Sequence, residues 1–466
     1  MAIINQVIST AMISYVCTSL GLLYTLPSST VELFSSVNTT LDRVMTQTEI
    51  SFMGSASSAS SFLITPFVWY FLNKLGRKRT LILFHLPQLI AWIILVTINK
   101  VEAVLLAMFI SGLSGSTFLI IPVFVSEYCE VSIRGAMMSG HIIFYELGIM
   151  ISYFFGGFLE YKTIMYISLI MSAVALGMIC CIRESPLYLI QKERDEEAVK
   201  SIQFYRGLKK NCSEISREVE CIRKILNFDC GNNDSDEKQS LKKDDIPSEK
   251  LSFIQILTKS RTTRRIVFKL LFIQTVSIFQ GLIVVQVFAK PLLQFAVPSM
   301  SATLSTVLFA LVVAISSLIG AYLLDTVGRR PLFINAATAT GLCCVILGTQ
   351  MHFNWGPSWL TAVFMNFYFF FYILGAGTIP TVLIGELFLP ETRIFAAVLC
   401  AEWSFLCNFI LLSIFIPLEK SFGLGAIFYL FAVCSFITAI ATCILIPETM
   451  GLRIDEIQLK LLRNRK

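Results

Sequence analysis

The stretch Gly320-Ala-Tyr-Leu-Leu-Asp325-Thr-Val-Gly328-Arg329-Arg330-Pro-Leu332 decides the fold. An apolar run of helix length ends in an acid, and a glycine, two arginines and a second apolar run follow. Gly328 permits a tight turn because glycine tolerates positive φ, and paired arginines favour the cytoplasmic face of a membrane. The stretch therefore predicts two membrane helices joined by a short cytoplasmic turn. Asp325 is a boundary carboxylate that needs a partner.

Three signals of this kind occur twice in the chain, in the same order. Each pairs a motif of the first half with one of the second: Gly76-Arg77-Lys78 with Gly328-Arg329-Arg330, Glu127…Arg134 with Glu386…Arg393, and Glu184-Ser185-Pro186 with Pro447-Glu448-Thr449. The paired glycines lie 252 residues apart, and the two pairs of glutamates lie 259 and 264 residues apart. Because the offset is nearly constant, we interpret the chain as two similar halves in parallel order.

The composition is that of an integral membrane protein. The chain has 466 residues, of which 55% are hydrophobic and 15% charged, and its mean hydropathy is +0.74. Apolar runs of about 20 residues are long enough to cross a bilayer. We predict an all-α protein with twelve transmembrane helices in two pseudo-symmetric six-helix bundles. The predicted spans lie near residues 7–28, 52–72, 80–98, 103–126, 136–158, 163–182, 266–289, 303–324, 332–351, 358–384, 395–416 and 425–446.

The basic residues predict the orientation in the membrane. Of 37 Lys and Arg, the assignment leaves five in or beside outside segments: Arg43, Lys100, Lys162, Lys290 and Lys420. This asymmetry predicts cytoplasmic termini in a multi-pass protein of the plasma membrane. It also accounts for the net charge of +6 without nucleic acid. The outside loop 35–48 carries the sequon Asn38-Thr39-Thr40, so Asn38 is a candidate glycosylation site.

Four segments follow from this assignment. We predict a first bundle at 1–190, a cytoplasmic linker at 191–262, a second bundle at 263–450 and a cytoplasmic tail at 451–466. The linker alternates charged and apolar residues, a pattern typical of short amphipathic helices. Its part 231–250 is polar and is expected to be disordered. The 13 cysteines fall mostly in spans or cytoplasmic segments and do not form a disulfide framework.

The repeated charged residues predict a gate at the cytoplasmic surface. Charges at a partly dehydrated helix end favour pairing over exposure. A cluster that forms when the cytoplasmic side closes would therefore act as a latch. The predicted gate residues are Arg77, Lys78, Glu127 and Arg134 in the first half and Asp325, Arg329, Arg330, Glu386 and Arg393 in the second. Asn73 stands in the first half where the second has the acid Asp325.

Together these motifs resemble the sugar porter family of the major facilitator superfamily, and the match covers nearly the whole chain. The stretch Thr48-Glu49-Ile50-Ser51-Phe52-Met53-Gly54-Ser55 resembles the insect facilitated trehalose transporter-like group. The resemblance implies a monomeric facilitative carrier in the lipid bilayer that moves a neutral sugar, such as trehalose or a hexose, by alternating access. It implies no enzyme activity, cofactor, metal or nucleic-acid partner.

The sugar-contact motifs depart from this family pattern. Ile142, Ile278 and Ile283 stand where the family has polar side chains, and Thr381 replaces a tryptophan. Each sugar hydroxyl must exchange water for a protein partner, so the losses predict weak binding. Polar residues of the same helices are candidate substitutes: Gln280, Asn408, Ser277, Glu146, Thr378 and Thr381. For each of them a hydrogen bond between helices is the alternative.

Glu146 is the least usual of these residues because a carboxylate within a span is a functional hypothesis by default. It is a buried neutral acid, a substrate acceptor or a proton site. Two rival functions stay open: a proton-coupled or non-sugar small-solute carrier, and a sugar sensor that does not transport. The chain shows no metal-ligand spacing, phosphate loop or nucleophile motif.

Overall fold

The structure is a computed structural model that describes residues 2–207, 261–296, 300–388 and 390–448, with isolated positions at 215, 219, 220, 223 and 450. The side chains of residues 2, 131, 261–263, 325 and 390–394 lie outside that description. The segment 231–250 and the tail 451–466, for which the sequence predicts disorder and a cytoplasmic position, also lie outside the described residues.

The first half crosses the membrane six times. Its helices are α1 (Ala2–Tyr24) with α2 (Leu26–Phe34), α3 (Gln47–Ile64) with α4 (Val68–Leu75), α5 (Arg77–Thr97), α6 (Val101–Gly112) with α7 (Thr117–Tyr128), α8 (Val131–Phe158) and α9 (Tyr161–Cys181). The first crossing continues to Phe34, beyond the predicted end, because Pro27 lies in the first turn of α2, where no backbone donor is needed. Thr46 and Glu49 form a capping box that starts α3.

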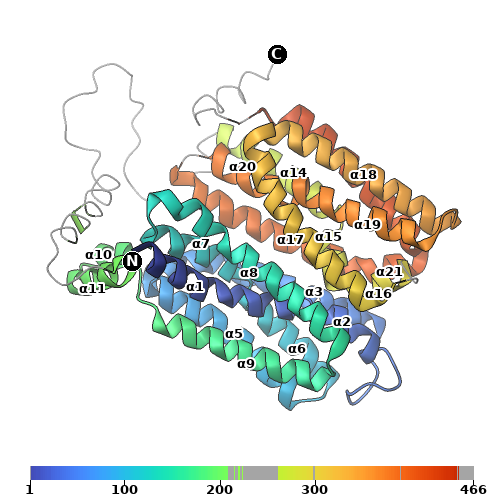
Figure 1. Cartoon of the computed structure of the whole chain (residues 1–466), viewed down its shortest axis with the longest axis horizontal. Coiled ribbons are helices and arrows are strands. Elements are labelled where there is room, and N and C mark those ends of the chain that lie inside the picture. The colour runs from blue at the N-terminus through green and yellow to red at the C-terminus, as the bar shows by residue number, and fades with distance from the viewer. Residues whose placement is uncertain are drawn as a thin grey trace.

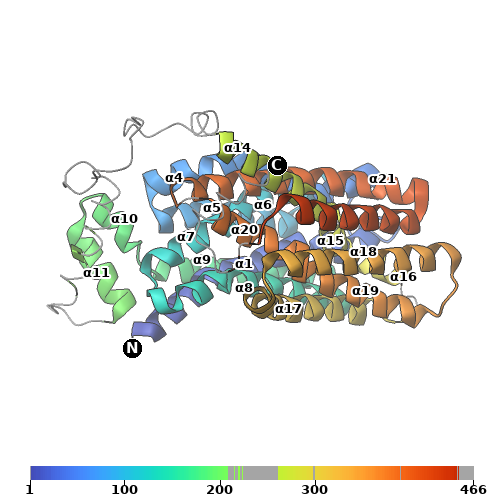
Figure 2. The ribbon, with the colours of Figure 1, turned by 90° about the horizontal axis from the view of Figure 1, so that it is seen from above.

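Two short helices follow at the end of the first bundle, and the second half then repeats the plan. The short helices are α10 (Pro186–Gln191) and α11 (Asp195–Arg206), and they lie beside the N-terminus in Figures 1 and 2. The second half contains α14 (Arg261–Ile278), α15 (Leu282–Val287), α16 (Ala289–Ala296), α17 (Ala302–Val327), α18 (Arg329–Phe353), α19 (Ser358–Tyr372), a π-helix (Ile373–Gly377), α20 (Ile379–Leu387) and α21 (Pro390–Leu445).

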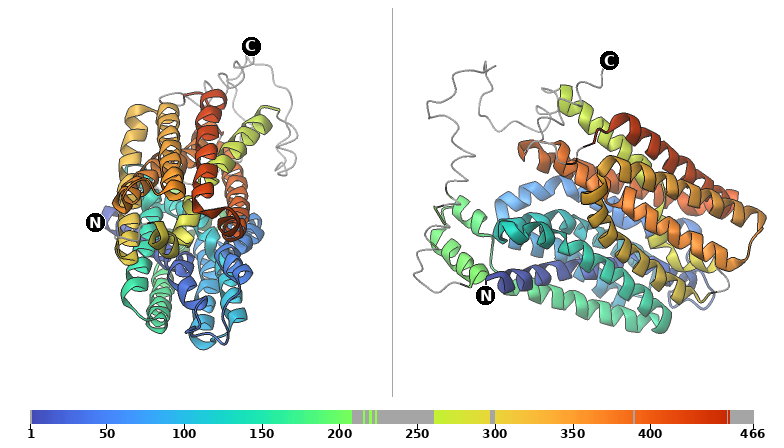
Figure 3. Two further views of the ribbon diagram at one scale, coloured as in Figure 1. Left: turned by 90° about the vertical axis from the view of Figure 1, so that its right-hand side faces the viewer. Right: turned by 45° about the horizontal axis from the view of Figure 1, so that its top comes forward.

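The prediction of twelve membrane helices in two bundles is confirmed. Nine described helices are long and apolar enough to span a bilayer. The broken helices α3–α4 and α14–α16 each supply one further crossing. The longest helix, α21, supplies two because it reverses at Gly423, where φ is +77°. Figure 3 shows the second half, coloured yellow to red, above the first half, coloured blue to green.

Small residues bring the helices of each bundle close together. A Cβ added to Gly148 of α8 would lie 2.2 Å from the carbonyl oxygen of Thr18 in α1. One added to Gly112 of α6 would lie 2.1 Å from the carbonyl oxygen of Ser57 in α3. Helices in lipid gain stability from such close packing. These contacts fix the distances between α1 and α8 and between α3 and α6.

Candidate functional site

Two turns carry matching polar networks, one in each bundle. The turn from α4 to α5 lies at Gly76 and the turn from α17 to α18 at Gly328, with φ of +94° and +96°. A Cβ at Gly76 would lie 2.6 Å from Oε2 of Glu184, and one at Gly328 would lie 3.1 Å from Oε2 of Glu448. Glycine is thus needed at both turns for the backbone conformation and for the close approach of a carboxylate.

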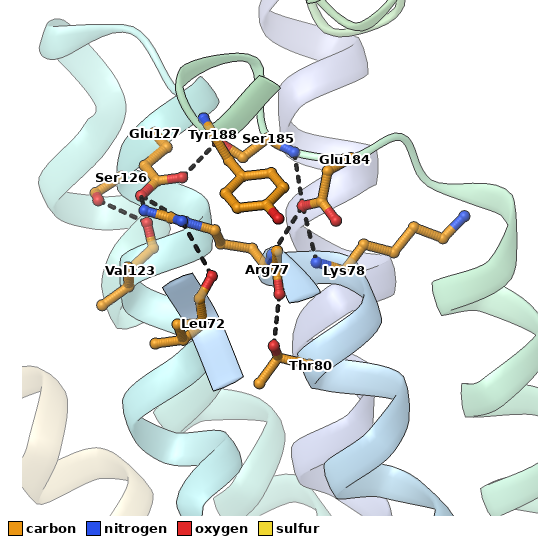
Figure 4. Close-up of polar contacts among 11 residues, drawn as sticks. Leu72, Arg77, Lys78, Thr80, Val123, Ser126, Glu127, Glu184, Ser185 and Tyr188 are labelled. Carbon is orange, nitrogen blue, oxygen red and sulfur yellow. Dashed lines mark hydrogen bonds and ion pairs between the residues drawn. The ribbon is translucent and has the colours of Figure 1, made fainter. Parts of the chain in front are cut away.

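In each turn that carboxylate caps a helix. Oε1 of Glu184 accepts the backbone N–H groups of Arg77 and Lys78, both at 2.9 Å (Figure 4). Glu448 accepts those of Arg329 and Arg330 at 3.1 and 3.0 Å. The first N–H groups of a helix have no partner within it, and a negative charge at this end is favourable. The caps thus stabilise the start of α5 and of α18.

In the first bundle the network closes around a buried ion pair. Nε and Nη2 of Arg77 donate to Oε1 of Glu127 at 2.8 and 2.6 Å, and the hydroxyl of Ser185 donates to its other oxygen. The side chains of Arg77 and Glu127 are 6% and 9% exposed. The guanidinium lies 5.2 Å from the ring centre of Tyr188 and donates to the carbonyl of Leu72 (Figure 4). The pair therefore ties α4, α5, α7 and α10 together.

The second bundle contains the matching pair. Nε of Arg329 donates to Oε1 of Glu386 at 2.9 Å, and Nη1 donates to the carbonyl of Leu324 at 3.0 Å. These side chains are 15% and 24% exposed. The pair thus ties α17 and α18 to α20 in a more open setting.

Lys78 and Arg330 take equivalent positions at the end of the last helix of each bundle. Nζ of Lys78 donates to the carbonyls of Cys180 and Ile182, each at 2.7 Å. Nη2 of Arg330 donates to the carbonyl of Cys443 at 2.7 Å. A cation at the carbonyl end of a helix is favourable because the last carbonyls have no helical donor. These two residues thus act as caps at the carbonyl ends of the two bundles' last helices.

Arg134, Asp325 and Arg393 complete the predicted gate residues. Arg134 donates to the carbonyl of Cys129 at 3.3 Å, whereas the guanidinium bonds described for Glu127 come from Arg77. The side chains of Asp325 and Arg393 lie outside the described part of the structure. The ion pairs above each join helices of one bundle, so a latch between the bundles requires further partners. The gate role of this set stays a prediction.

Helix α11, which the sequence analysis predicts to be cytoplasmic, packs directly against the first network. Tyr205 stacks on Tyr128 with ring centres 4.2 Å apart and donates to the carbonyl of Arg183 at 2.7 Å. Burial raises the pKa of Tyr205 well above its usual value, so this hydroxyl stays a donor at physiological pH. Arg206 pairs with Glu130 at 2.6 Å. The helix is thereby fixed to the inner end of α7, beside Glu127.

Two of the predicted substrate contacts lie inside the second bundle. Gln280 is fully buried, and its Nε2 donates to the hydroxyl of Thr438 in α21 at 2.9 Å. Ser277 is also buried. The amide oxygen of Gln280 and the hydroxyl of Ser277 have no hydrogen-bond partner in the described structure. Tyr368 and Tyr372 donate to the backbone carbonyls of these two residues at 2.7 and 3.3 Å, where α14 breaks before Gly281.

The other predicted contacts are more accessible. Asn408 is half-buried in α21, and Thr381 is exposed on α20. Thr378 donates to the carbonyl of Ile373 at 2.8 Å and Thr381 to that of Thr378 at 2.7 Å, so both hydroxyls keep a free acceptor side. Within the described residues, no three His, Cys, Asp or Glu side chains are placed to hold a metal ion.

Glu146 lies on the face of α8 that meets the second bundle. Tyr153, seven residues further on, donates to the carbonyl of Gln286 at 2.8 Å, and a Cβ at Gly157 would lie 2.1 Å from Thr303. Residues seven apart share a helix face. Oε2 of Glu146 is buried without a hydrogen-bond partner in the described structure. A carboxylate oxygen between the bundles is thus available to a ligand.

The described polar contacts between the bundles lie at the end that the sequence analysis predicts to be outside. The backbone N–H of Lys290 donates to the hydroxyl of Ser28 at 2.9 Å, and its Nζ lies 3.2 Å from Glu32. Towards the inner end of α8, Ile142 and Ile143 are 43% and 59% exposed. The bundles are therefore joined by polar contacts near the Phe158 end of α8, while isoleucines towards its Val131 end are exposed. Asn38 is exposed between α2 and α3, and both the outside position of this segment and the glycosylation of Asn38 stay predictions.

Comparisons with known proteins identify the family and the fold. The profile of the family described as "Sugar (and other) transporter" matches residues 1–461. The facilitated trehalose transporter of Polypedilum vanderplanki is 24% identical over 451 residues, covering 94% of this chain and 84% of the relative. The facilitated trehalose transporter of Bombyx mori is 24% identical over 437 residues, covering 91% and 81%.

Solved structures share the architecture. The inward-open xylose transporter XylE from E. coli superposes with a TM-score of 0.75 at 16% identity, covering 98% of this chain and 99% of that one. The human organic anion transporter MFSD10 superposes with a TM-score of 0.60 at 16% identity, covering 94% and 99%. Since both identities are low, these likenesses establish the fold and leave the substrate open.

Proposed function

The chain belongs to the family of sugar transporters, and we propose that it carries a small neutral sugar by facilitated, uncoupled transport. The predicted resemblance to sugar porters is confirmed at the level of family and fold. The chain is a membrane-spanning sugar transporter and not an enzyme. The proposal concerns what lies beyond this: the uncoupled mode, the substrate, and the residues that bind it.

One observation carries the substrate proposal. Three of the predicted contacts present acceptor atoms without a partner in the described structure: Glu146 Oε2, Ser277 Oγ and Gln280 Oε1. A buried polar atom without a partner costs about 1–3 kcal/mol. A ligand rich in hydroxyl donors removes that penalty, and a sugar is such a ligand. We propose that these three residues, with Asn408, Thr378 and Thr381, supply the sugar's polar contacts.

Trehalose is the first candidate substrate and a hexose the second. The relatives from Polypedilum vanderplanki and Bombyx mori are named for trehalose. Thr381 is smaller than the tryptophan of the family pattern and leaves more room for a disaccharide. Isoleucines at 142, 278 and 283 remove hydrogen-bonding partners worth about 1 kcal/mol each, so we expect low affinity.

Uptake by the full chain tests the substrate. Trehalose, glucose and an organic anion are offered separately to oocytes that express the wild type, Glu146→Ala, Gln280→Ala or Asn408→Ala. We expect saturable trehalose uptake and a severalfold higher half-saturation concentration in each variant, with Asn38→Gln as the matched control on the outer loop. Uptake of the anion without uptake of either sugar would contradict the proposal. Sugar binding without uptake would instead indicate a sensor.

Proton coupling is the second candidate because of Glu146. Its oxygen without a partner lies between the bundles. A titrating group at that place would contact the substrate and would also respond to movement of the two bundles. We expect no accumulation of sugar when an inward proton gradient is imposed on liposomes. Accumulation that Glu146→Gln abolishes would establish coupling instead.

We further propose a monomer in the plasma membrane, without nucleic-acid partners, with both termini cytoplasmic and residues 35–48 outside. The support is the distribution of Lys and Arg. On intact cells an epitope tag at residue 40 is expected to bind antibody, and a C-terminal tag only after permeabilisation. The reverse pattern would invert the topology.

The gate is proposed to act through Asp325 and Arg393. Asp325→Asn is expected to favour the conformation open to the cytoplasm by removing a partner of the closed inner side. The readout is the rate at which maleimide labels a cysteine placed at Ile142, which is 43% exposed. An unchanged rate together with unchanged transport would assign these charges to topology alone.

A further inference from the structure

The inner end of α9 carries two adjacent thiols on its outward face. Cys180 and Cys181 are the last two residues of this helix, and both are exposed. The buried face of α9 contains Ile164, Ser168, Ser172, Ala175 and Ile179. The opposite face carries the exposed residues Tyr166, Ile170, Val174, Gly177 and Cys181, which recur every three or four residues. In a membrane protein that face contacts lipid.

Gly177 has no packing role on this face. A Cβ added there would have no atom within 4 Å, unlike the glycines that bring helices together. Glycine within a helix is less favourable than alanine, so its presence here is not explained by helix stability. Located one turn before Cys181, it leaves a bare strip of helix between this cysteine and Val174. Such a strip can seat a hydrocarbon chain that starts at the sulfur and follows the helix into the bilayer.

The depth of the thiols is set by the charges around them. The ammonium of Lys78 donates to the carbonyls of Cys180 and Ile182, and Arg183, which follows, is exposed. Lysine and arginine side chains at a helix end lie at the level of the lipid headgroups. The two thiols therefore lie at the boundary between hydrocarbon and cytoplasm, where a membrane-bound acyltransferase works.

We propose that Cys180 and Cys181 form an S-acylation site for a long-chain fatty acid. The thiolate attacks the carbonyl carbon of a long-chain acyl-coenzyme A thioester. A new carbon–sulfur bond forms, the bond to coenzyme A breaks, and the proton of the cysteine thiol ends on the released coenzyme A. Nothing is oxidised or reduced. Juxtamembrane cysteines are the usual substrates of this reaction. The acyl chain would hold the junction of α9 and α10, beside Glu184, against the inner leaflet.

Cys443 provides a matched comparison at the end of α21. It is exposed at the equivalent depth, and its carbonyl is bound by Arg330 as that of Cys180 is by Lys78. However, the residue one turn before it is the exposed Ile440 and not a glycine, and no cysteine adjoins it. We therefore expect acylation at Cys180 and Cys181 and none at Cys443.

The experiment uses the full chain in cultured eukaryotic cells. Free thiols are blocked, thioesters are cleaved with hydroxylamine, and the released thiols are counted by a maleimide-polymer mass shift. We expect a hydroxylamine-dependent shift of one or two tags in the wild type and in Cys443→Ser, and its loss in Cys180→Ser/Cys181→Ser. Peptide mapping locates the released thiols. No shift in the wild type, or an unchanged shift in the double variant, overturns the proposal.

This inference rests on the proposed orientation, because acyl-coenzyme A is on the cytoplasmic side. The tag experiment at residue 40 tests that orientation separately, so the two failures are distinguishable. Sugar uptake by the double variant reports whether it is folded, and we expect uptake at the wild-type level.

Discussion

The inner networks of the two bundles share one plan and differ in burial. In both, four residues meet at one turn. They are a glycine with positive φ, an arginine, a glutamate from the fourth membrane crossing of the bundle and a capping glutamate. The side chains of the first pair are 6% and 9% exposed, whereas those of the second are 15% and 24% exposed. Loss of one partner lowers the free energy of unfolding far more when the ion pair is buried than when it is exposed to water. The difference indicates a rigid first bundle and a more adjustable second one.

The largest expected effect separates these two ion pairs. Arg77→Gln leaves the carboxylate of Glu127 buried without its cation, which destabilises by about 3–5 kcal/mol. Arg329→Gln leaves Glu386 where water reaches it, so we expect a smaller loss of stability and a larger change in transport. The measurement is thermal unfolding of the purified proteins, beside uptake. Equal losses of stability in the two variants would contradict the inference that the first bundle is the more rigid one.

Ser185→Ala tests the hydroxyl contact to Glu127 in the first network. The hydroxyl donates to Glu127, and a hydrogen bond to a charged group contributes about 1.5–3 kcal/mol. Ser185 also precedes α10 and accepts the N–H of Tyr188 at 3.3 Å. Ser185→Thr is the matched control because it keeps the hydroxyl. Threonine and alanine variants of equal stability would show that the bond contributes nothing.

Gly76→Ala and Gly328→Ala compare the two turns directly. Both glycines have backbone angles that essentially require glycine, and strain of this kind costs about 1–3 kcal/mol. The added Cβ would meet the capping carboxylate at 2.6 Å in the first turn and at 3.1 Å in the second. We therefore expect Gly76→Ala to lower the unfolding temperature more. A larger effect at Gly328 would contradict the assignment of the first network as the tighter one.

The twelve crossings and the two tight turns were predictable because apolar length and Gly-Arg motifs are local signals. The capping roles of Glu184 and Glu448 were not, although their repeat at a nearly constant offset was visible. Glu184 and the backbone of Arg77 are 107 residues apart in the chain, so their contact depends on how α5 and α9 pack. The face of the helix on which the Gln280 side chain lies was equally unpredictable, because a sequence does not state how a helix is rotated about its axis.

The smallest expected effect concerns the outer contact between the bundles. The pair Glu32–Lys290 is 54% and 27% exposed, and exposed pairs contribute about 0–1 kcal/mol. Unlike the inner pairs, it joins one bundle to the other, so its loss should shift conformations rather than unfold the protein. In Lys290→Gln we expect an impermeant maleimide to label a cysteine at Ser28 up to about fivefold faster, because Ser28 is buried in the structure.

The charge exchange Glu32→Lys/Lys290→Glu should restore the slow rate, and the labelling of a cysteine at the exposed position Asn38 should not change. Because salt screens exposed charges, the wild type should approach the rate of Lys290→Gln at high ionic strength. If neither the substitution nor salt changes the labelling rate, the ion pair does not hold the bundles together at this end. The hydrogen bonds from the Lys290 backbone to Ser28 and from Tyr153 to Gln286 would then do so.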